Sequence, residues 1–257
     1  MVLIIGGDST IGLALSCYWE KRKIPFHSST RHKELKSDIR PFIDLTRIHT
    51  FKNLSNYRVA VICAAVTNMA ICERQTKKTK SVNVTGTIEL IKVFCNNNTH
   101  ILFLSTNQVF DGEKPCQYPD STRNPINDYG RQKADVEKFL ENVTNTCILR
   151  LTKVIHPELK LLKQWQRILS AGDSIVAFDD MTLSPVNLDD VIIKIDLLIR
   201  DKAIGIYQLS GKSDISYYDF ARHFAKKNGY SPKRVKKDTW KGKLEYEPPK
   251  YTSMVNV

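Results

Sequence analysis

The chain is 257 residues long, 42% of them hydrophobic, and it carries a formal net charge of +12. Such a length forms one large domain or two small ones with a substantial hydrophobic core. No apolar run approaches the ~20 residues that a membrane-spanning helix requires, and no basic segment with a cleavage site precedes Val2. We therefore expect a cytoplasmic protein without a membrane span or a signal peptide.

The excess of positive charge is compatible with nucleic acid or with small anionic ligands, because both present phosphate groups. Apart from residues 231–243, the lysines are scattered along the chain. No helix-turn-helix, RNP or zinc-finger pattern accompanies them. We therefore expect small anionic ligands and no nucleic acid.

The cysteines show no paired spacing, and no cluster of His and Cys has the spacing of metal ligands. We expect reduced thiols, most of them in the core, and no bound metal. The six residues are Cys17, Cys63, Cys72, Cys95, Cys116 and Cys147.

Residues 2–5 form a short continuous apolar run, which is typical of a strand buried on both faces of a parallel sheet. A glycine loop follows from Gly6 to Gly12 and leads into a helical pattern. A glycine loop between a strand and a helix lets the backbone approach a pyrophosphate, which lies on the first amides of the helix. We expect cofactor-binding residues at Gly6, Ser9, Thr10, Ile11 and Gly12.

The second strand is expected over residues 24–29. Dinucleotide-binding units that prefer NAD usually carry an acid at the end of this strand, and none is present here. Ser29 and Arg31 occupy the position instead, and an arginine suits the 2′-phosphate of NADP. The alternative is an ordinary solvated basic turn. We predict NADP as the cofactor.

The segment from Ile101 to Lys133 carries the predicted chemistry. It reads as a buried strand ending in Ser105 and Thr106, a loop, and a helix with Tyr129 and Lys133 four residues apart on one face. An ammonium beside a phenol favours the phenolate, so Lys133 is expected to lower the pKa of Tyr129. Either strand-end hydroxyl is placed to hold a substrate carbonyl. A second Tyr-x-x-x-Lys pattern, at 246–250, contains two prolines and cannot form such a helix.

Two motifs carry a family resemblance: STNQVFDG at 105–112 and PINDYGRQK at 125–133. They resemble the extended branch of the short-chain dehydrogenase/reductase superfamily, and within it the dTDP-4-dehydrorhamnose reductases. The resemblance implies an α/β fold with a Rossmann-type, doubly wound parallel sheet and a small C-terminal substrate-binding subdomain. It implies an NADP-binding domain at 1–155 and a substrate-binding subdomain at 156–257, from which residues of about 183–200 return to the Rossmann core.

The resemblance also assigns residues between the motifs. Asp44 and Leu45 match a segment beside the adenine, Ala64 and Ala65 match small residues along the cofactor, and Asn83 matches a helical asparagine. Thr67 and Asn68 open a segment that faces the substrate. Lys153 replaces a tryptophan that stacks on the nucleotide base of the substrate in the relatives, and we expect it to contact a phosphate or carboxylate instead.

The remaining elements alternate between strands and helices, which is typical of a doubly wound sheet. We expect a fourth buried strand over 59–67, a helix over 81–95 and a strand over 147–155. Next come a helical segment and a short strand between 156 and 182, and then a strand and a helix that Asp189 or Asp190 caps. A strand and a Ser-capped helix occupy 205–229.

The function implied by the resemblance is NADPH-dependent reduction of a keto group on a nucleotide-activated or otherwise anionic sugar, within nucleotide-sugar metabolism and polysaccharide biosynthesis. Thr106 orients the carbonyl, Tyr129 donates the proton, and Lys133 assists Tyr129 and holds the nicotinamide ribose. Ser105 and Lys153 are expected on the substrate side. Two alternatives stay open: a nucleotide-sugar epimerase or dehydratase, and a non-catalytic NADP-binding subunit of another enzyme. All three of these functions are compatible with a homodimer or with binding to a partner enzyme.

Overall fold

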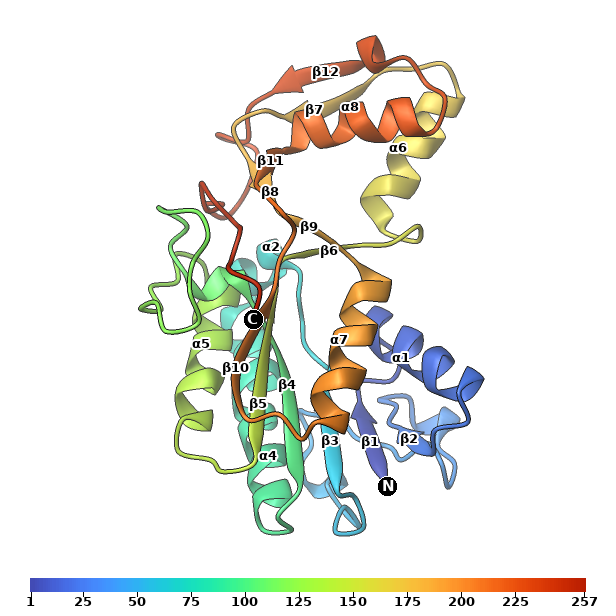
Figure 1. Cartoon of the computed structure of the whole chain (residues 1–257), viewed down its shortest axis with the longest axis vertical. Coiled ribbons are helices and arrows are strands. Elements are labelled where there is room, and N and C mark those ends of the chain that lie inside the picture. The colour runs from blue at the N-terminus through green and yellow to red at the C-terminus, as the bar shows by residue number, and fades with distance from the viewer.

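A sheet of six parallel strands forms the centre of the protein (Figure 1). The computed structural model describes residues 1–257. The strands lie in the order β10-β5-β4-β3-β1-β2, and every neighbouring pair is parallel. Their bounds are β1 Val2–Ile5, β2 Phe26–Ser28, β3 Val59–Ile62, β4 His100–Thr106, β5 Thr146–Leu151 and β10 Gly205–Leu209.

Helices cover both faces of this sheet (Figure 1). On one face, Phe94 and Val136 pack with Phe103 of β4, and on the other, Leu15 and Ile195 belong to the same apolar cluster as Leu104 of β4. Every residue of β4 is buried, which explains its continuous apolar sequence. The predicted doubly wound parallel sheet is therefore confirmed. The covering helices are α4 Thr87–Cys95 and α5 Asp128–Leu140 on one side, and α1 Thr10–Lys21 and α7 Leu188–Arg200 on the other.

The strand order reverses at β1, which lies between β2 and β3. Loops that leave the carboxyl ends of β1 and β3 run in opposite directions, and in doubly wound sheets ligands bind in the crevice between such loops. The loop after β1 is the glycine loop, and the segment after β3 runs through residues 63–67. The topology therefore brings two of the predicted cofactor segments together.

A smaller unit lies beyond the carboxyl ends of these strands, at the top of Figure 1. Its core contains Trp165, Leu169, Ala221 and Val235. It is built from α6 Lys160–Ser170, β7 Ile175–Phe178, α8 Tyr217–Lys227 and β12 Val235–Asp238. Two small sheets lie where the chain passes between the units, and they pair β6 Lys153–Ile155 with β9 Pro185–Asn187 and β8 Thr182–Leu183 with β11 Ile215–Ser216.

Short helices connect β3 to α4 and follow several of the strands. The connection consists of α2 Met69–Arg74, α3 Thr76–Lys80 and a π-helical turn at Ser81–Gly86, which continues into α4. Single 3₁₀ turns occur at Lys33–Leu35, Ile48–Thr50, Asn107–Val109 and Pro232–Arg234. None of the helices is both long enough and apolar enough to cross a bilayer.

Several sequence predictions need correction at the level of single elements. The strand at 59–62 is the third of the sheet, because residues near Phe42 form only an isolated bridge to Thr30. The strand expected over 147–155 is divided at Thr152, where the chain leaves the main sheet as β6. Asn187 occupies the N-cap position of α7, so Asp189 and Asp190 lie in the first turn, where acids favour the helix dipole.

The prediction that most cysteines belong to the core is also wrong. All six are free thiols, but Cys17, Cys95 and Cys116 are exposed, and only Cys72 and Cys147 are fully buried. The first two occupy outward positions of amphipathic helices, where a small residue is tolerated on either face.

A buried ion pair joins α5 to the sheet. Arg150 of β5 and Glu137 of α5 are 1% and 0% exposed. The guanidinium of Arg150 donates to both carboxylate oxygens, with Nη2–Oε2 at 2.7 Å and Nε–Oε1 at 3.0 Å. Ser105 donates a further hydrogen bond to Glu137. Because a buried charge is tolerated only when it is paired, this contact fixes the position of α5 on the sheet.

We predict that Arg150→Met lowers the free energy of unfolding by about 3 kcal/mol, because the carboxylate of Glu137 stays buried without its main partner. Urea denaturation of the two proteins measures the difference. As a control, Arg222→Met removes one partner of an exposed ion pair, Arg222–Asp219 at 3.8 Å, and should cost less than about 1 kcal/mol. Similar losses in the two variants would contradict the assignment.

Candidate active site

A cleft of about 340 Å³ opens between the carboxyl ends of the sheet strands and the smaller unit. Its walls come from both units, because the glycine loop and β4 contribute on one side and residues near Met181 and Tyr217 on the other. Ten of the residues predicted from the sequence line it: Ser9, Thr10, Ile11, Ala65, Thr67, Ser105, Thr106, Tyr129, Lys133 and Lys153.

The glycine loop supplies one end of the cleft. Gly6 has φ +84°, and a Cβ atom there would lie 2.7 Å from the backbone of Ala64, so only glycine fits. Ser9 caps α1, because its Oγ accepts a hydrogen bond from the amide of Gly12 at 3.1 Å. The amides of Thr10 and Ile11, at the start of α1, donate no hydrogen bond within the protein. A helix start with free amides fits the pyrophosphate of a dinucleotide.

The end of β2 lies against this loop. The amide of Gly6 donates to the Oγ of buried Ser29 at 3.0 Å, so Ser29 holds the loop in place. Arg31 follows with an exposed side chain that makes no ion pair in the structure. Ser29 thus contacts the glycine loop, Arg31 follows two residues later, and neither residue lines the cleft.

Other residues assigned to the cofactor have different surroundings. Asp44 accepts hydrogen bonds from the amide and hydroxyl of Thr46, at 2.9 and 2.7 Å, within its own turn. Leu45 packs in the core, and Ala64 contacts Gly6. None of the three lines the cleft.

Two predicted asparagines hold the backbone near the cleft. Asn83, 2% exposed, accepts from the amide of Val66 at 2.7 Å and donates to the carbonyl of Val66 at 2.9 Å and to Gln132 at 2.8 Å. Asn68 caps α2 by accepting from the amide of Ile71 at 3.0 Å. Both side chains therefore position the segment 66–71, from which Thr67 and Met69 reach the cleft.

Lys133 lines the cleft with almost none of its surface exposed. It is 3% exposed, its Nζ donates to the carbonyl of Leu104 at 2.8 Å, and the same atom lies 4.4 Å from the centre of the Phe103 ring. Burial lowers the pKa of Lys133 to about 8, although the nearby carboxylate of Glu137 opposes this shift. The side chain is thus close to losing its charge at mildly alkaline pH.

The expectation that Lys133 lowers the pKa of Tyr129 is wrong for this structure. Burial raises the pKa of Tyr129, and the neighbouring thiol of Cys72 adds to the effect. The ammonium of Lys133 points to the carbonyl of Leu104, and desolvation of the phenol dominates. Tyr129 is therefore protonated at neutral pH.

The two strand-end hydroxyls differ. Ser105 donates to Glu137 and so belongs to the buried ion-pair network, even though part of it reaches the cleft wall. The hydroxyl of Thr106 accepts from the amide of Gln108 at 3.2 Å and donates only a long hydrogen bond, at 3.4 Å, to Oδ1 of Asn107, which a better acceptor in the cleft can replace. Thr106 is the hydroxyl that can contact a ligand.

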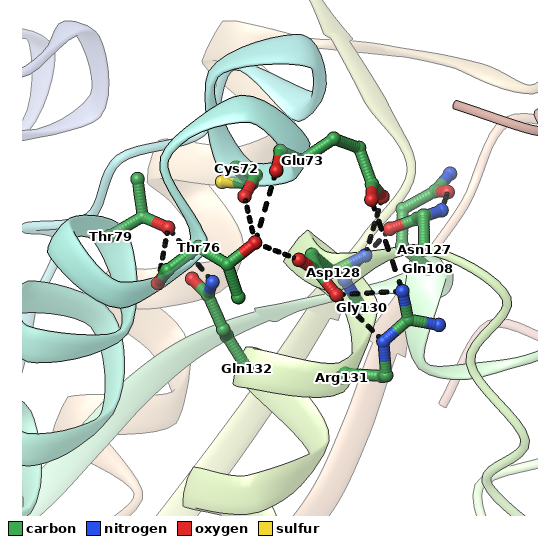
Figure 2. Close-up of polar contacts among 10 residues, drawn as sticks. All are labelled: Cys72, Glu73, Thr76, Thr79, Gln108, Asn127, Asp128, Gly130, Arg131 and Gln132. Atoms are coloured by element: carbon green, nitrogen blue, oxygen red, sulfur yellow. Dashed lines mark hydrogen bonds and ion pairs between the residues drawn. The ribbon is translucent and has the colours of Figure 1, made fainter. Parts of the chain in front are cut away.

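A polar network fixes the start of α5 on both sides of Tyr129 (Figure 2). Asn127 caps the helix by accepting from the amide of Gly130 at 2.8 Å, and the amide of Asp128 donates to Glu73 of α2 at 2.8 Å. The side chain of Asp128 accepts from Thr76 and from Arg131. One turn further, Gln132 donates to Thr79 at 2.9 Å.

This network joins α5 to α2 and α3, which follow the substrate-facing segment. Sequence reasoning missed it, because Glu73, Thr76 and Thr79 lie in short polar helices with no motif. The only signal was the helical spacing of Thr76 and Thr79, which places both on one face.

The far wall of the cleft contains Lys153 and His156. Desolvation by the surrounding protein lowers the pKa of Lys153, and it also lowers the pKa of His156, which Lys153 depresses further. A second, apolar cavity of about 470 Å³ adjoins this wall and shares Met181 and Tyr217 with the cleft. A ligand in the cleft therefore meets a cation and an apolar surface on the same side.

The chain also closes the cleft from its last residues, which the sequence indicated only faintly. Pro248, Pro249 and Thr252 line the wall, and the amide of Tyr251 donates to the carbonyl of Gly112 at 2.8 Å. Gly112 has φ +72°, and a Cβ atom there would lie 2.2 Å from Pro249, so the glycine of the first motif permits this approach.

The family model described as "RmlD substrate binding domain" matches residues 1–255 of the sequence. The chain belongs to this family. A dTDP-4-dehydrorhamnose reductase of Aggregatibacter actinomycetemcomitans is 29% identical over 63% of the chain, and the match spans only 58% of that relative. A dTDP-4-keto-6-deoxy-D-glucose reductase of Streptomyces niveus is 26% identical over 91% of the chain and 81% of its own length.

The RmlD fold is shared with solved structures. A dTDP-4-dehydrorhamnose reductase from Bacillus anthracis, in complex with NADP, matches with a TM-score of 0.88 over 100% of the chain and 90% of its own, at 21% identity. At this identity the likeness establishes the fold alone. A different kind of relative is methionine adenosyltransferase 2 subunit beta of Xenopus laevis, 27% identical over 63% of the chain and 52% of its own length.

The ionisation of Asp128 can be used to test how much the network at the start of α5 stabilises the protein. Burial by itself would raise the pKa of Asp128, but the hydrogen bonds from Thr76 and Arg131 outweigh burial and lower it. A lowered pKa means that the stabilisation is present above the unfolded pKa of about 3.9 and is lost as the pH falls through the folded value.

We therefore expect Asp128→Asn to lower the free energy of unfolding by about 1–2 kcal/mol at neutral pH, and this difference to shrink below about pH 4. Urea denaturation at several pH values measures it. Asp135→Asn, in an exposed pair with Lys80, is the control and should change little. A loss that is the same at every pH would refute the charged role of Asp128.

Proposed function

We propose that the protein catalyses the NADPH-dependent reduction of a keto group on a nucleotide-activated or otherwise anionic sugar. The observation that carries this proposal is that Tyr129, Lys133 and Thr106 line one cleft together with Ser9, Thr10 and Ile11, where the glycine loop passes into α1. The proton donor and the dinucleotide site are thus close enough to serve one carbonyl. Relatives described as dTDP-4-keto sugar reductases, and one described in complex with NADP, support the same chemistry.

The residues present fit the cofactor. The free amides of Thr10 and Ile11 receive the pyrophosphate, and Arg31 offers a guanidinium to the 2′-phosphate. The small side chains of Ala64 and Ala65 leave room beside β3. When bound, NADPH supplies the hydride.

The proton comes from the protein. Thr106 donates a hydrogen bond to the carbonyl oxygen and orients it, and Tyr129 transfers its phenolic proton to that oxygen as the carbon is reduced. Because burial raises the pKa of Tyr129, the phenol keeps its proton until the carbonyl oxygen becomes basic. Lys133, whose Nζ donates to the carbonyl of Leu104 in the structure, is the residue that would hold the nicotinamide ribose.

On the substrate side, Thr67, Ser105 and Lys153 line the cleft, Asn68 caps the helix that follows Thr67, and Lys153 receives an anionic group of the substrate. The predicted phosphate or carboxylate contact fits an exposed cationic side chain on the cleft wall, which solvent leaves accessible to a charged ligand. The adjoining apolar cavity fits an uncharged part of the same ligand.

A second candidate function is that of a non-catalytic NADP-binding subunit. It is favoured by the relatives described as subunit beta of methionine adenosyltransferase 2. Consumption of NADPH in the presence of keto sugars separates the two, because a regulatory subunit binds the cofactor without turnover. An epimerase would interconvert sugars with no net consumption.

We expect Tyr129→Phe to reduce turnover about 10²–10⁴-fold while leaving NADPH binding intact, because the ring stays and only the acid is lost. Lys133→Met should weaken both turnover and NADPH binding. Absorbance of NADPH reports turnover, and calorimetry reports binding. Near-normal turnover in Tyr129→Phe would rule out the assigned proton donor.

Lys153→Ala tests the substrate side. We expect weaker binding of dTDP, UDP, CDP and simple sugar phosphates alike, and a loss of the salt dependence that the wild type shows. The comparison of dissociation constants at low and high salt is the measurement. Tight binding of dTDP that is equal in wild type and variant would exclude a phosphate contact at Lys153.

A further inference from the structure

The loop after β2 folds back along the end of that strand. The amide of Ser28 donates to the carbonyl of Ile39 at 3.0 Å, and the amide of Thr30 donates to the carbonyl of Pro41 at 3.0 Å. In the parallel register set by the bridge between Thr30 and Phe42, Arg40 lies opposite Ser28, the last residue of β2. The amide of Ile43 completes the arrangement by donating to Thr30 at 2.9 Å.

Arg40 reaches from this position to the glycine loop. Its Nη2 donates to the carboxylate of Asp8, which also accepts from the hydroxyl of Thr30 at 2.7 Å. The side chain of Arg40 is 34% exposed, but its Nε is buried and has no hydrogen-bond partner. Buried donors are rarely left unpaired in proteins, so the contacts within the protein satisfy the guanidinium of Arg40 incompletely.

The place of Arg40 matches one part of the dinucleotide. In doubly wound folds the 2′ position of the adenosine ribose lies at the end of the second strand, next to the glycine loop. Arg40 lies at this junction, since it contacts Asp8 of the loop and lies opposite Ser28, next to the Ser29 that accepts from the amide of Gly6. A guanidinium there presents a planar pair of donors to a phosphate.

We propose that Arg40 is the residue that distinguishes NADPH from NADH, by donating from Nε and a terminal nitrogen to the 2′-phosphate. The inference rests on the proposed function, since it presupposes a dinucleotide in the cleft. Asp8 holds the guanidinium in position before the ligand binds, which reduces the entropy lost on binding. Arg31 lies nearby with an exposed side chain and no partner to orient it, so it contributes charge more than directed hydrogen bonds.

The test compares dissociation constants for NADPH and NADH in the wild type, Arg40→Ala and Arg31→Ala, measured by calorimetry. Arg40→Ala should weaken NADPH binding about tenfold to a hundredfold and leave NADH binding within about twofold. Arg31→Ala should have a smaller effect on NADPH. Arg58→Ala is the matched control. Arg58 is exposed and directly precedes the first residue of β3, at the end of the strand that lies away from the glycine loop.

Fragments of the cofactor isolate the contribution of the 2′-phosphate to binding. Adenosine 2′,5′-bisphosphate should bind the wild type more tightly than 5′-AMP, and this preference should disappear in Arg40→Ala. Arg40→Lys keeps the charge but not the planar pair, so it should recover only part of the preference.

The outcomes separate this inference from the proposed function. A wild type that binds neither cofactor overturns both. If Arg40→Ala keeps the preference for NADPH, or loses affinity for NADPH and NADH equally, Arg40 only shapes the loop and the inference is wrong. If Arg31→Ala alone abolishes the preference, Arg31 is the discriminating residue, and the proposed function survives without Arg40.

Discussion

The buried pair of Glu137 and Arg150 determines where helix α5 lies, and that helix carries Tyr129 and Lys133 to the cleft. Tyr129, Lys133 and Glu137 follow one another at intervals of four residues, so they share the face that looks toward β4. Glu137 binds Arg150 and Ser105, and Lys133 binds the carbonyl of Leu104. The phenol of Tyr129 is carried on the same rigid face to the cleft wall. The buried ion pair thus holds in position the helix that presents the phenol of Tyr129 to the cleft.

The walls of the cleft come from two parts of the protein that are held in place in different ways. The glycine loop, the end of β4 and the start of α5 are held by short hydrogen bonds between elements of the main sheet, as expected of groups that must keep fixed distances for chemistry. The opposite wall comes from the smaller unit and from the last residues of the chain. Relatives described as a dTDP-4-keto-6-deoxy-D-glucose reductase and as methionine adenosyltransferase 2 subunit beta both match this sequence, so family membership alone assigns no single role, and the role depends on the few side chains that face the cleft.

The sequence predicted the parallel sheet, the glycine loop and the Tyr129 helix, because each depends on local periodicity or on glycines at fixed positions. The sequence did not predict contacts between segments that are far apart in the chain. Arg40 was overlooked because its approach to Asp8 depends on a loop that folds back, and nothing in the local pattern specifies that path. The direction of the pKa shift of Tyr129 was wrong for a related reason. Spacing alone shows that Lys133 is near, but not that its proton is directed to a backbone carbonyl or that burial exceeds the effect of charge.

The low pKa of Lys133, about 8, has a consequence for the way ligands enter the cleft. A ligand whose oxygens approach Nζ favours the charged ammonium, so its binding draws a proton from solvent whenever the lysine is partly neutral. Association and proton uptake then become one linked equilibrium, whose apparent strength declines as the medium becomes more alkaline. The depth at which this lysine is buried thereby makes the occupancy of the cleft sensitive to the acidity of its surroundings.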